Sequence, residues 1–165
     1  MTEGPTGYSL AIMTYPNGLA DAGNDGFIRV DTADARTVAR LRNELSLWLR
    51  AHFALDAARL NDVLLSANEA LTNAAEFAYP GRRGTMTIQA RYDAADGTLS
   101  VDVSDCGTWR QTDPKVQSNT RGRGIPLMRA LADRATISQL PTGTWVQLQF
   151  GDVPPIGVQP CGTRA

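Results

Sequence analysis

Two polar side chains stand four residues apart in a stretch that is otherwise rich in alanine and leucine. Residues 68–79 read NEALTNAAEFAY, and on a helix the spacing of Glu69 and Asn73 points both side chains the same way. An amide oxygen suits Mg²⁺, which keeps several waters and takes further oxygens from phosphates. A carboxylate one turn away can accept a proton from a nucleophile. The alternative is that both side chains lie on the solvated edge of an amphipathic helix.

An aspartate and a glycine follow a strand-like run further along the chain. In Asp105-Cys106-Gly107 the carboxylate could accept a hydrogen bond from an exocyclic amine at the floor of a pocket, and the glycine would let a flat ring approach the backbone. The same residue types are also typical of a plain turn. Thr144, in a later Gly-Thr pair, becomes interesting only as a hydroxyl near such an aspartate.

A glycine-rich turn opens a third apolar segment. Arg121, Gly122, Arg123 and Gly124 directly precede a helical pattern, and exposed N–H groups at a helix N-terminus form an anion site. The two arginines would add phosphate donors. The competing interpretation is a flexible helix entry.

Hydrophobic periodicity indicates the elements that must position these residues. Helical period is expected over residues 31–53, 56–79 and 124–134, and strands over 27–31, 85–93, 98–105, 135–140 and 144–150. The order predicts an α+β fold, a two-layer α/β sandwich in which helices cover one face of a mainly antiparallel sheet. Residues 27–150 would form the domain, between a flexible N-terminal arm (1–26) and a flexible C-terminal tail (151–165).

Composition narrows the class of protein. The net charge of −1 gives no electrostatic footprint for nucleic acid or an anionic membrane. No apolar run approaches the roughly 18 residues of a membrane span, and the N-terminus lacks the pattern of a secretory signal. The two cysteines make neither a CxxC pair nor a disulfide framework, so a cytoplasmic location is the expectation.

Taken in order, the motifs resemble those of the ATPase superfamily shared by gyrase B, Hsp90, histidine kinases and MutL. The likeness is greatest to its small branch of anti-sigma-factor serine/threonine kinases. EALTNAAEFAY is similar to the N-box of that branch, VSDCGTW to its first glycine box, and TRGRGIPLMRALAD to its second. The resemblance covers about residues 27–150 and implies a Bergerat-type ATP-binding fold, with ATP and Mg²⁺ as ligands.

The resemblance also implies a role for each matching residue. Glu69 would be the general base, Asn73 would coordinate Mg²⁺ on the ATP phosphates, and Asp105 would bind the adenine amino group. Gly107 would lie beneath the ring and Thr144 would support the network. The residues expected near the phosphates are Arg121, Gly122, Arg123 and Gly124, with residues 110–121 as a short ATP lid.

By the same resemblance, the protein would phosphorylate a small anti-anti-sigma protein and otherwise hold a sigma factor inactive. A homodimer is a further expectation, and Arg36 and Arg40 on the first helix are candidate partner contacts unless they only face water. The first glycine box departs from the common Asp-x-Gly-x-Gly at Trp109, which keeps open a second hypothesis, a non-catalytic ATP-binding regulator that works through partner binding. Arg82 and Arg83, just after a helix end, are expected to face water.

Overall fold

The computed structural model describes residues 26–108 and 124–157, which contain five strands and three helices in the order β1-α1-α2-β2-β3-α3-β4-β5. The strands are β1 (Phe27–Thr32), β2 (Thr85–Asp93), β3 (Thr98–Asp105), β4 (Arg134–Leu140) and β5 (Gly143–Phe150). The helices are α1 (Ala35–His52), α2 (Ala57–Phe77) and α3 (Gly124–Leu131).

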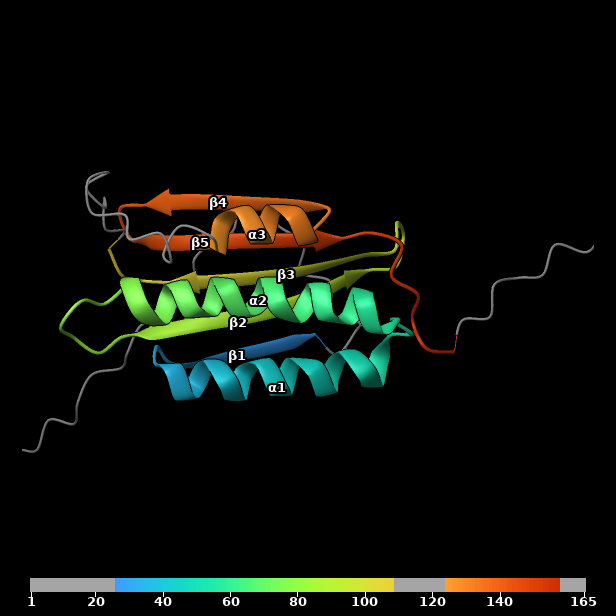
Figure 1. Cartoon of the computed structure of the whole chain (residues 1–165), viewed down its shortest axis with the longest axis horizontal. Coiled ribbons are helices and arrows are strands. Elements are labelled where there is room, and N and C mark those ends of the chain that lie inside the picture. The colour runs from blue at the N-terminus through green and yellow to red at the C-terminus, as the bar shows by residue number, and fades with distance from the viewer. Residues whose placement is uncertain (1–25, 109–123, 158–165) are drawn as a thin grey trace, which may run out of the picture.

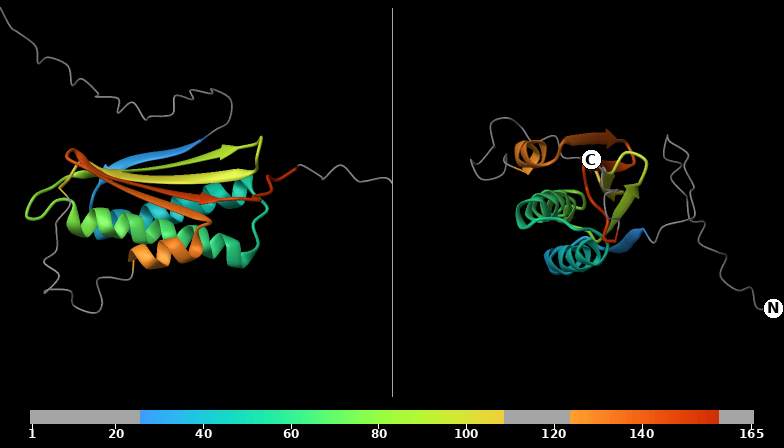
Figure 2. Two further views of the ribbon diagram at one scale, coloured as in Figure 1. Left: turned by 90° about the horizontal axis from the view of Figure 1, so that it is seen from above. Right: turned by 90° about the vertical axis from the view of Figure 1, so that its right-hand side faces the viewer.

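The strands form one sheet with the order β1-β2-β3-β5-β4, and every neighbouring pair is antiparallel. All three helices cover one face of this sheet, and α2 lies between α1 and α3 (Figures 1 and 2). The predicted α+β sandwich with an antiparallel sheet is therefore confirmed.

Alternation of apolar and polar residues determines which face of each strand is buried. Successive side chains of a strand point to opposite faces, so one face of β2, β3 and β5 carries the apolar residues that meet the helices. Those buried in the core from these strands are Met86, Ile88, Ala90, Leu99, Val101, Val103, Val146, Leu148 and Phe150. The helices contribute a matching stripe, with Leu41, Leu45 and Leu49 from α1, Val63, Ala67, Ala70, Leu71 and Ala74 from α2, and Met128 from α3. The alanines on α2 leave room for this central helix to pack against the sheet and both neighbouring helices.

Aspartate side chains fix where the two long helices begin. Asp34 accepts a hydrogen bond from the Thr37 N–H at 2.8 Å, and Asp56 accepts one from the Arg59 N–H at 2.7 Å. Each bond satisfies an N–H that would otherwise lack a partner in the first turn. The first helix thus begins at Ala35, later than the periodicity from residue 31 predicted.

The prediction that the chain leaves the domain after residue 150 is wrong for residues 151–157. Val153 is 2% exposed, its N–H donates to the Gly97 carbonyl at 3.0 Å, and its carbonyl accepts from the Tyr92 hydroxyl at 2.8 Å. The carbonyl of Pro154 accepts from the Ala54 N–H at 2.8 Å. Proline and glycine content suggested mobility, but one apolar side chain and a set of backbone bonds hold this segment on the domain. Residues 1–25 of the predicted arm and residues 158–165 of the predicted tail lie outside the described residues.

Candidate functional site

Glu69 and Asn73 face the start of α3. Both side chains are half-buried on α2. A Cβ placed on Gly124, the first residue of α3, would lie 3.2 Å from Glu69 Oε2 and 3.5 Å from Asn73 Nδ2. The structure therefore brings together three residues that are predicted for the phosphate side of the site. The carboxylate and the amide meet a helix N-terminus, rather than the solvated helix edge of the alternative interpretation.

Asp105 ends β3 as a buried carboxylate with a defined orientation. It is 8% exposed, and its Oδ1 accepts from the Gly107 N–H at 3.0 Å and from the Thr144 N–H at 3.3 Å. Burial raises the pKa of this carboxyl above its ordinary value, and the two N–H donors oppose that rise. Thr144 was expected to act through its hydroxyl, whereas the contact with Asp105 is made by its backbone N–H.

Gly107 is needed for a different reason from the one the sequence suggested. A Cβ at this position would lie 2.0 Å from the carbonyl oxygen of Ala78, just past the end of α2, and Thr108 N–H donates to that same oxygen at 3.0 Å. The close approach is thus between the turn after β3 and the last turn of α2. Without a side chain at residue 107, the backbone carrying Asp105 can bond directly to the helix that carries Glu69 and Asn73.

Gly143 is a second glycine that the close packing of this region requires. Its φ is +145°, and a Cβ would lie 1.9 Å from the Asp105 carbonyl oxygen. This approach lets the start of β5 pass beside the end of β3 and deliver the Thr144 N–H to the carboxylate. The sequence identified the Gly-Thr pair through its threonine; the glycine before it could have been found as the residue that must adopt a positive φ.

The remaining predicted nucleotide contacts fall outside the part of the chain that the structure describes. These are Arg121, Gly122, Arg123 and the predicted lid at residues 110–121, and Trp109, where the first glycine box departs from the common pattern, lies outside it too. Their roles stay predictions.

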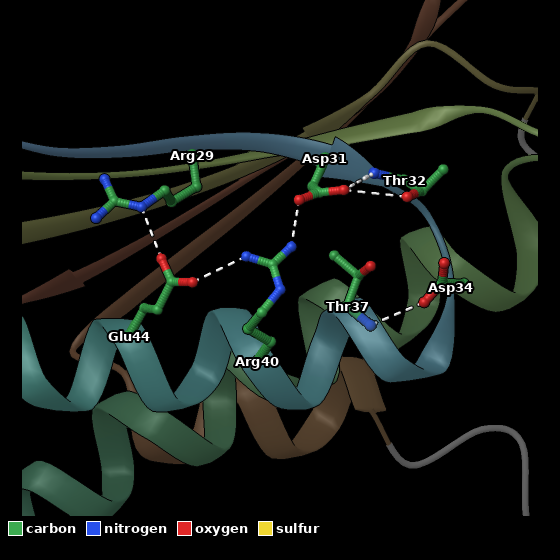
Figure 3. Close-up of polar contacts among 7 residues, drawn as sticks. All are labelled: Arg29, Asp31, Thr32, Asp34, Thr37, Arg40 and Glu44. Atoms are coloured by element: carbon green, nitrogen blue, oxygen red, sulfur yellow. Dashed lines mark hydrogen bonds and ion pairs between the residues drawn. The ribbon is translucent and has the colours of Figure 1, made fainter.

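Arg40, a predicted partner contact, is engaged within its own chain. Its guanidinium pairs with Asp31 of β1 and with Glu44 one turn along α1 at 2.8 Å, while Glu44 also pairs with Arg29 at 2.7 Å (Figure 3). The bond from the Thr32 N–H and the bond from Arg40 lower the pKa of Asp31, and the bond from Arg29 is the main cause of the lowered pKa of Glu44. A partner would have to replace these bonds to use Arg40.

Arg36 is exposed on the first turn of α1 and has no part in the ion pairs of Arg40 and Glu44. Its charge contributes only as a minor cause to the lowered pKa of Asp34, behind the bond from the Thr37 N–H, so it keeps its place as the candidate contact of the two. Within the described ranges, no helix is both long and apolar enough to cross a membrane.

The fold is similar to that of a solved structure. The crystal structure of the RsbU and RsbW domains of Rv1364c from Mycobacterium tuberculosis matches with a TM-score of 0.63 and 19% sequence identity, over 80% of this chain and 34% of that chain. This chain thus spans about a third of the length of that protein's chain, and at this identity the likeness concerns the fold. The histidine kinase domain from the Erythrobacter litoralis EL346 blue-light activated histidine kinase matches at 23% identity, over 57% of this chain and 45% of that chain, with a TM-score of 0.47.

The sequence also matches a family of domains directly. The family is described as the histidine kinase-like ATPase domain, and the match runs from residue 32 to residue 150. This range contains the helix with Glu69 and Asn73, the strand that ends in Asp105, and the hairpin with Thr144. Because the match covers more than half of the chain, the protein belongs to the family of histidine kinase-like ATPase domains.

Proposed function

We propose that the protein binds ATP with Mg²⁺ and transfers the terminal phosphoryl group to a serine or threonine hydroxyl of a partner protein. The observation that carries this proposal is the meeting of Glu69 and Asn73 with the N-terminus of α3 at Gly124. A proton acceptor, a metal ligand and a set of helix N–H groups are the three components that phosphoryl transfer needs from a protein. ATP would supply the phosphoryl group, and Mg²⁺ would neutralise charge on its phosphates.

The base side of the site fits an adenine ring. Asp105 Oδ1 is held by the Gly107 and Thr144 N–H groups, which leaves Oδ2 as the proposed acceptor for an exocyclic amine. A carboxylate is an acceptor only, so it selects a base that presents a donor at this position. Because Asp105 is 8% exposed, water competes weakly for that bond.

The phosphate side fits transfer to a hydroxyl. Asn73 would hold the metal through its amide oxygen, and the first N–H groups of α3 would donate to phosphate oxygens. Glu69 would take the proton of the attacking hydroxyl while the new oxygen–phosphorus bond forms. The bond between the terminal phosphorus and its bridging oxygen breaks in the same step, and ADP leaves.

The partner protein would be an anti-anti-sigma protein, and a sigma factor would be the protein held inactive. The order of the four motifs supports this choice, since it resembles the anti-sigma kinase branch. The solved structure with the same fold contains an RsbW domain. Arg36, exposed on α1, would contribute to the partner surface.

Calorimetric titration of ATP into the full chain, with Mg²⁺ and with EDTA, tests the nucleotide site. Phosphotransfer is then measured with radiolabelled ATP and a panel of anti-anti-sigma proteins. Changing Glu69→Ala should leave ATP affinity within about twofold and reduce transfer by at least about 100-fold, the typical contribution of a general base. Glu76→Ala is the matched control, because Glu76 lies two turns further along α2 and is exposed.

The outcomes separate the hypotheses. Saturable, Mg²⁺-dependent binding with labelled product would support the kinase. Binding with no product for any protein of the panel would instead favour the non-catalytic ATP-binding regulator. A folded protein that binds no ATP would exclude both, and normal transfer by the Glu69→Ala variant would show that another group is the base.

A further inference from the structure

A tyrosine hydroxyl ties the segment just after α2 to the turn after β3. Tyr79 Oη donates to the Thr85 carbonyl at 2.6 Å and accepts from the Cys106 N–H at 2.8 Å. Thr85 begins β2, and Cys106 directly follows Asp105. One side-chain atom therefore joins the ends of two neighbouring strands to the residue just beyond α2.

The residues that follow Tyr79 seat its ring. A Cβ on Gly84 would lie 2.2 Å from the ring carbon Cε1, so only glycine leaves room for the ring there. On the ring, the Arg82 guanidinium lies 5.4 Å from the centroid, within the range of a cation–π contact. Arg82 is exposed, as predicted, and its guanidinium also contacts the Tyr79 ring. Residues 79–84 (YPGRRG) thus include the glycine and the arginine that hold the Tyr79 ring in place.

The hydroxyl keeps its proton across the physiological range. Burial is the main cause that raises the pKa of Tyr79 above its ordinary value of about 10. The proton is required for the bond to Thr85, because a carbonyl oxygen can only accept, and the hydroxyl oxygen accepts from the Cys106 N–H through a lone pair.

These bonds determine where the base-binding carboxylate lies relative to α2. The Cys106 N–H is the peptide group directly after Asp105, and the next N–H, from Gly107, donates to Asp105 Oδ1. A parallel bond joins Thr108 N–H to the Ala78 carbonyl. The turn is thus held at Cys106 and Thr108 to the two residues that follow α2, and the bond at Cys106 depends on a side-chain hydroxyl that substitution can remove.

We propose that Tyr79 is a positioning residue for nucleotide recognition, whose hydroxyl holds the Asp105 turn where the carboxylate can receive the exocyclic amine of a purine nucleotide. The inference rests on the proposed function, since it assigns Tyr79 a part in the selectivity of that same site. Removing the hydroxyl frees the Cys106 peptide and lets Asp105 move relative to Glu69 and Asn73. The effect should be greatest for a nucleotide that is recognised through its amine.

The test compares Tyr79→Phe with Tyr92→Phe in the full chain. Tyr92 is a matched control, because its hydroxyl also donates to a backbone carbonyl, that of Val153 at 2.8 Å, but lies near the β2–β3 hairpin, away from Asp105. Two readouts are taken. Calorimetry gives the affinities for ATP and for ITP, in which a carbonyl oxygen replaces the exocyclic amine. Amide exchange followed by NMR reports on the Cys106 and Gly107 N–H groups without any nucleotide.

We expect the unchanged protein and Tyr92→Phe to prefer ATP over ITP equally. Tyr79→Phe should reduce that preference by about threefold to tenfold, the effect of one lost hydrogen bond, and should speed exchange at Cys106 and Gly107. An unchanged ATP-to-ITP ratio in Tyr79→Phe would overturn the proposal, as would an equal loss in both variants. If the unchanged protein bound neither ATP nor ITP, the proposed function itself would be refuted, and with it the role of Tyr79 in selectivity. Faster exchange in Tyr79→Phe would then show only that the hydroxyl holds the Asp105 turn in place.

Discussion

Two buried aspartates on β3 should respond in opposite ways to the same substitution. Asp102 and Asp105 are 4% and 8% exposed. They stand three positions apart on the strand, an odd number, so their side chains point to opposite faces of the sheet. Asp105 lies on the helix side, with its Oδ1 bonded to two backbone N–H groups. Asp102 pairs on the other face with Arg91, whose Nη2 lies 2.7 Å away. Asp→Asn at each position removes one charge from the same strand.

Asp105→Asn should impair nucleotide binding and spare the fold. The amide oxygen can still accept from the Gly107 and Thr144 N–H groups, but the amide NH₂ would then face the amine of adenine. A lost bond to a charged acceptor, together with two donors that face each other, costs about 2–4 kcal/mol, or roughly 30-fold to 700-fold in affinity. The free energy of unfolding at pH 7 should stay constant or rise, because burial penalises the charged carboxylate and asparagine carries no charge.

The direction of the pKa shift gives a further check on this variant. The pKa of Asp105 is raised in the folded protein, so the stability it contributes is fully present below the unfolded-state value of about 4 and is lost as the pH rises through the folded-state value. The asparagine variant lacks this dependence. In urea unfolding, the free energy of unfolding of Asp105→Asn, relative to that of the unchanged protein, should therefore be higher at pH 7 than at pH 4.

Asp102→Asn should give the reverse result. It leaves the Arg91 guanidinium without its charged partner, and the arginine side chain is 42% exposed, so the loss is smaller than for a fully buried pair, about 1–3 kcal/mol of unfolding free energy. Affinity for ATP should not change. A variant at residue 105 that bound ATP normally, or that lost more stability than the variant at residue 102, would refute the assignment of Asp105 to the base pocket.

The remaining predictions concern close contacts and acid stability. Gly124→Ala should weaken Mg²⁺-ATP binding several-fold in calorimetry, because its Cβ would crowd the carboxylate and amide that face α3, while the melting temperature stays constant or rises with the better helix former. Gly107→Ala should cost about 3 kcal/mol in urea unfolding, since the new Cβ would overlap a backbone oxygen. Gly81→Ala, whose Cβ would meet nothing within 4 Å, should cost only about 1 kcal/mol for its positive φ. Bonds from Arg59 and from the Gly151 N–H lower the pKa of Asp133 in the folded protein. The ionised Asp133 therefore stabilises the fold above a pH of about 4, and this stabilisation is lost as the pH falls through the folded-state pKa. The stability difference between Asp133→Asn and the unchanged protein should accordingly be present at pH 7 and shrink as the pH falls below about 4, and a difference that stayed constant in acid would contradict this account.

Periodicity predicted the elements because burial on one face decides them. The strands 85–93 and 98–105 were predicted with the bounds that the structure gives, because apolar and polar residues that alternate over eight or nine positions fit a strand and not a helix. The helix ends were less accurate, because a side-chain cap such as Asp34 overrides the periodic pattern. Residues 151–157 were wrongly predicted to be a flexible tail because their proline and glycine content is typical of mobile segments. Composition does not reveal that Val153 is buried beside the β2–β3 hairpin.

The residue types of the site were predictable, and their contacts were not. Glu69, Asn73 and Asp105 each have an ordinary structural use when taken alone, and they stood out because the order of their motifs resembles that of the ATPase superfamily. The 3.2 Å approach of the Gly124 position to Glu69 depends on how α2 and α3 cross, which no local pattern encodes. The same holds for Tyr79, whose hydroxyl bonds to residues 6 and 27 positions away in the chain.

The chain between Thr108 and Gly124 begins and ends at the site, which bears on the two arginines predicted to bind phosphate. Thr108 N–H is held by the Ala78 carbonyl at the end of α2, and Gly124 lies against the side chains of Glu69 and Asn73. Arg121 and Arg123 precede Gly124 by three residues and one residue, and a chain spans at most about 3.6 Å per residue. Because both predicted phosphate donors are so few residues from Gly124 in the sequence, replacing either arginine by alanine should weaken ATP binding, and more at low salt than at high salt.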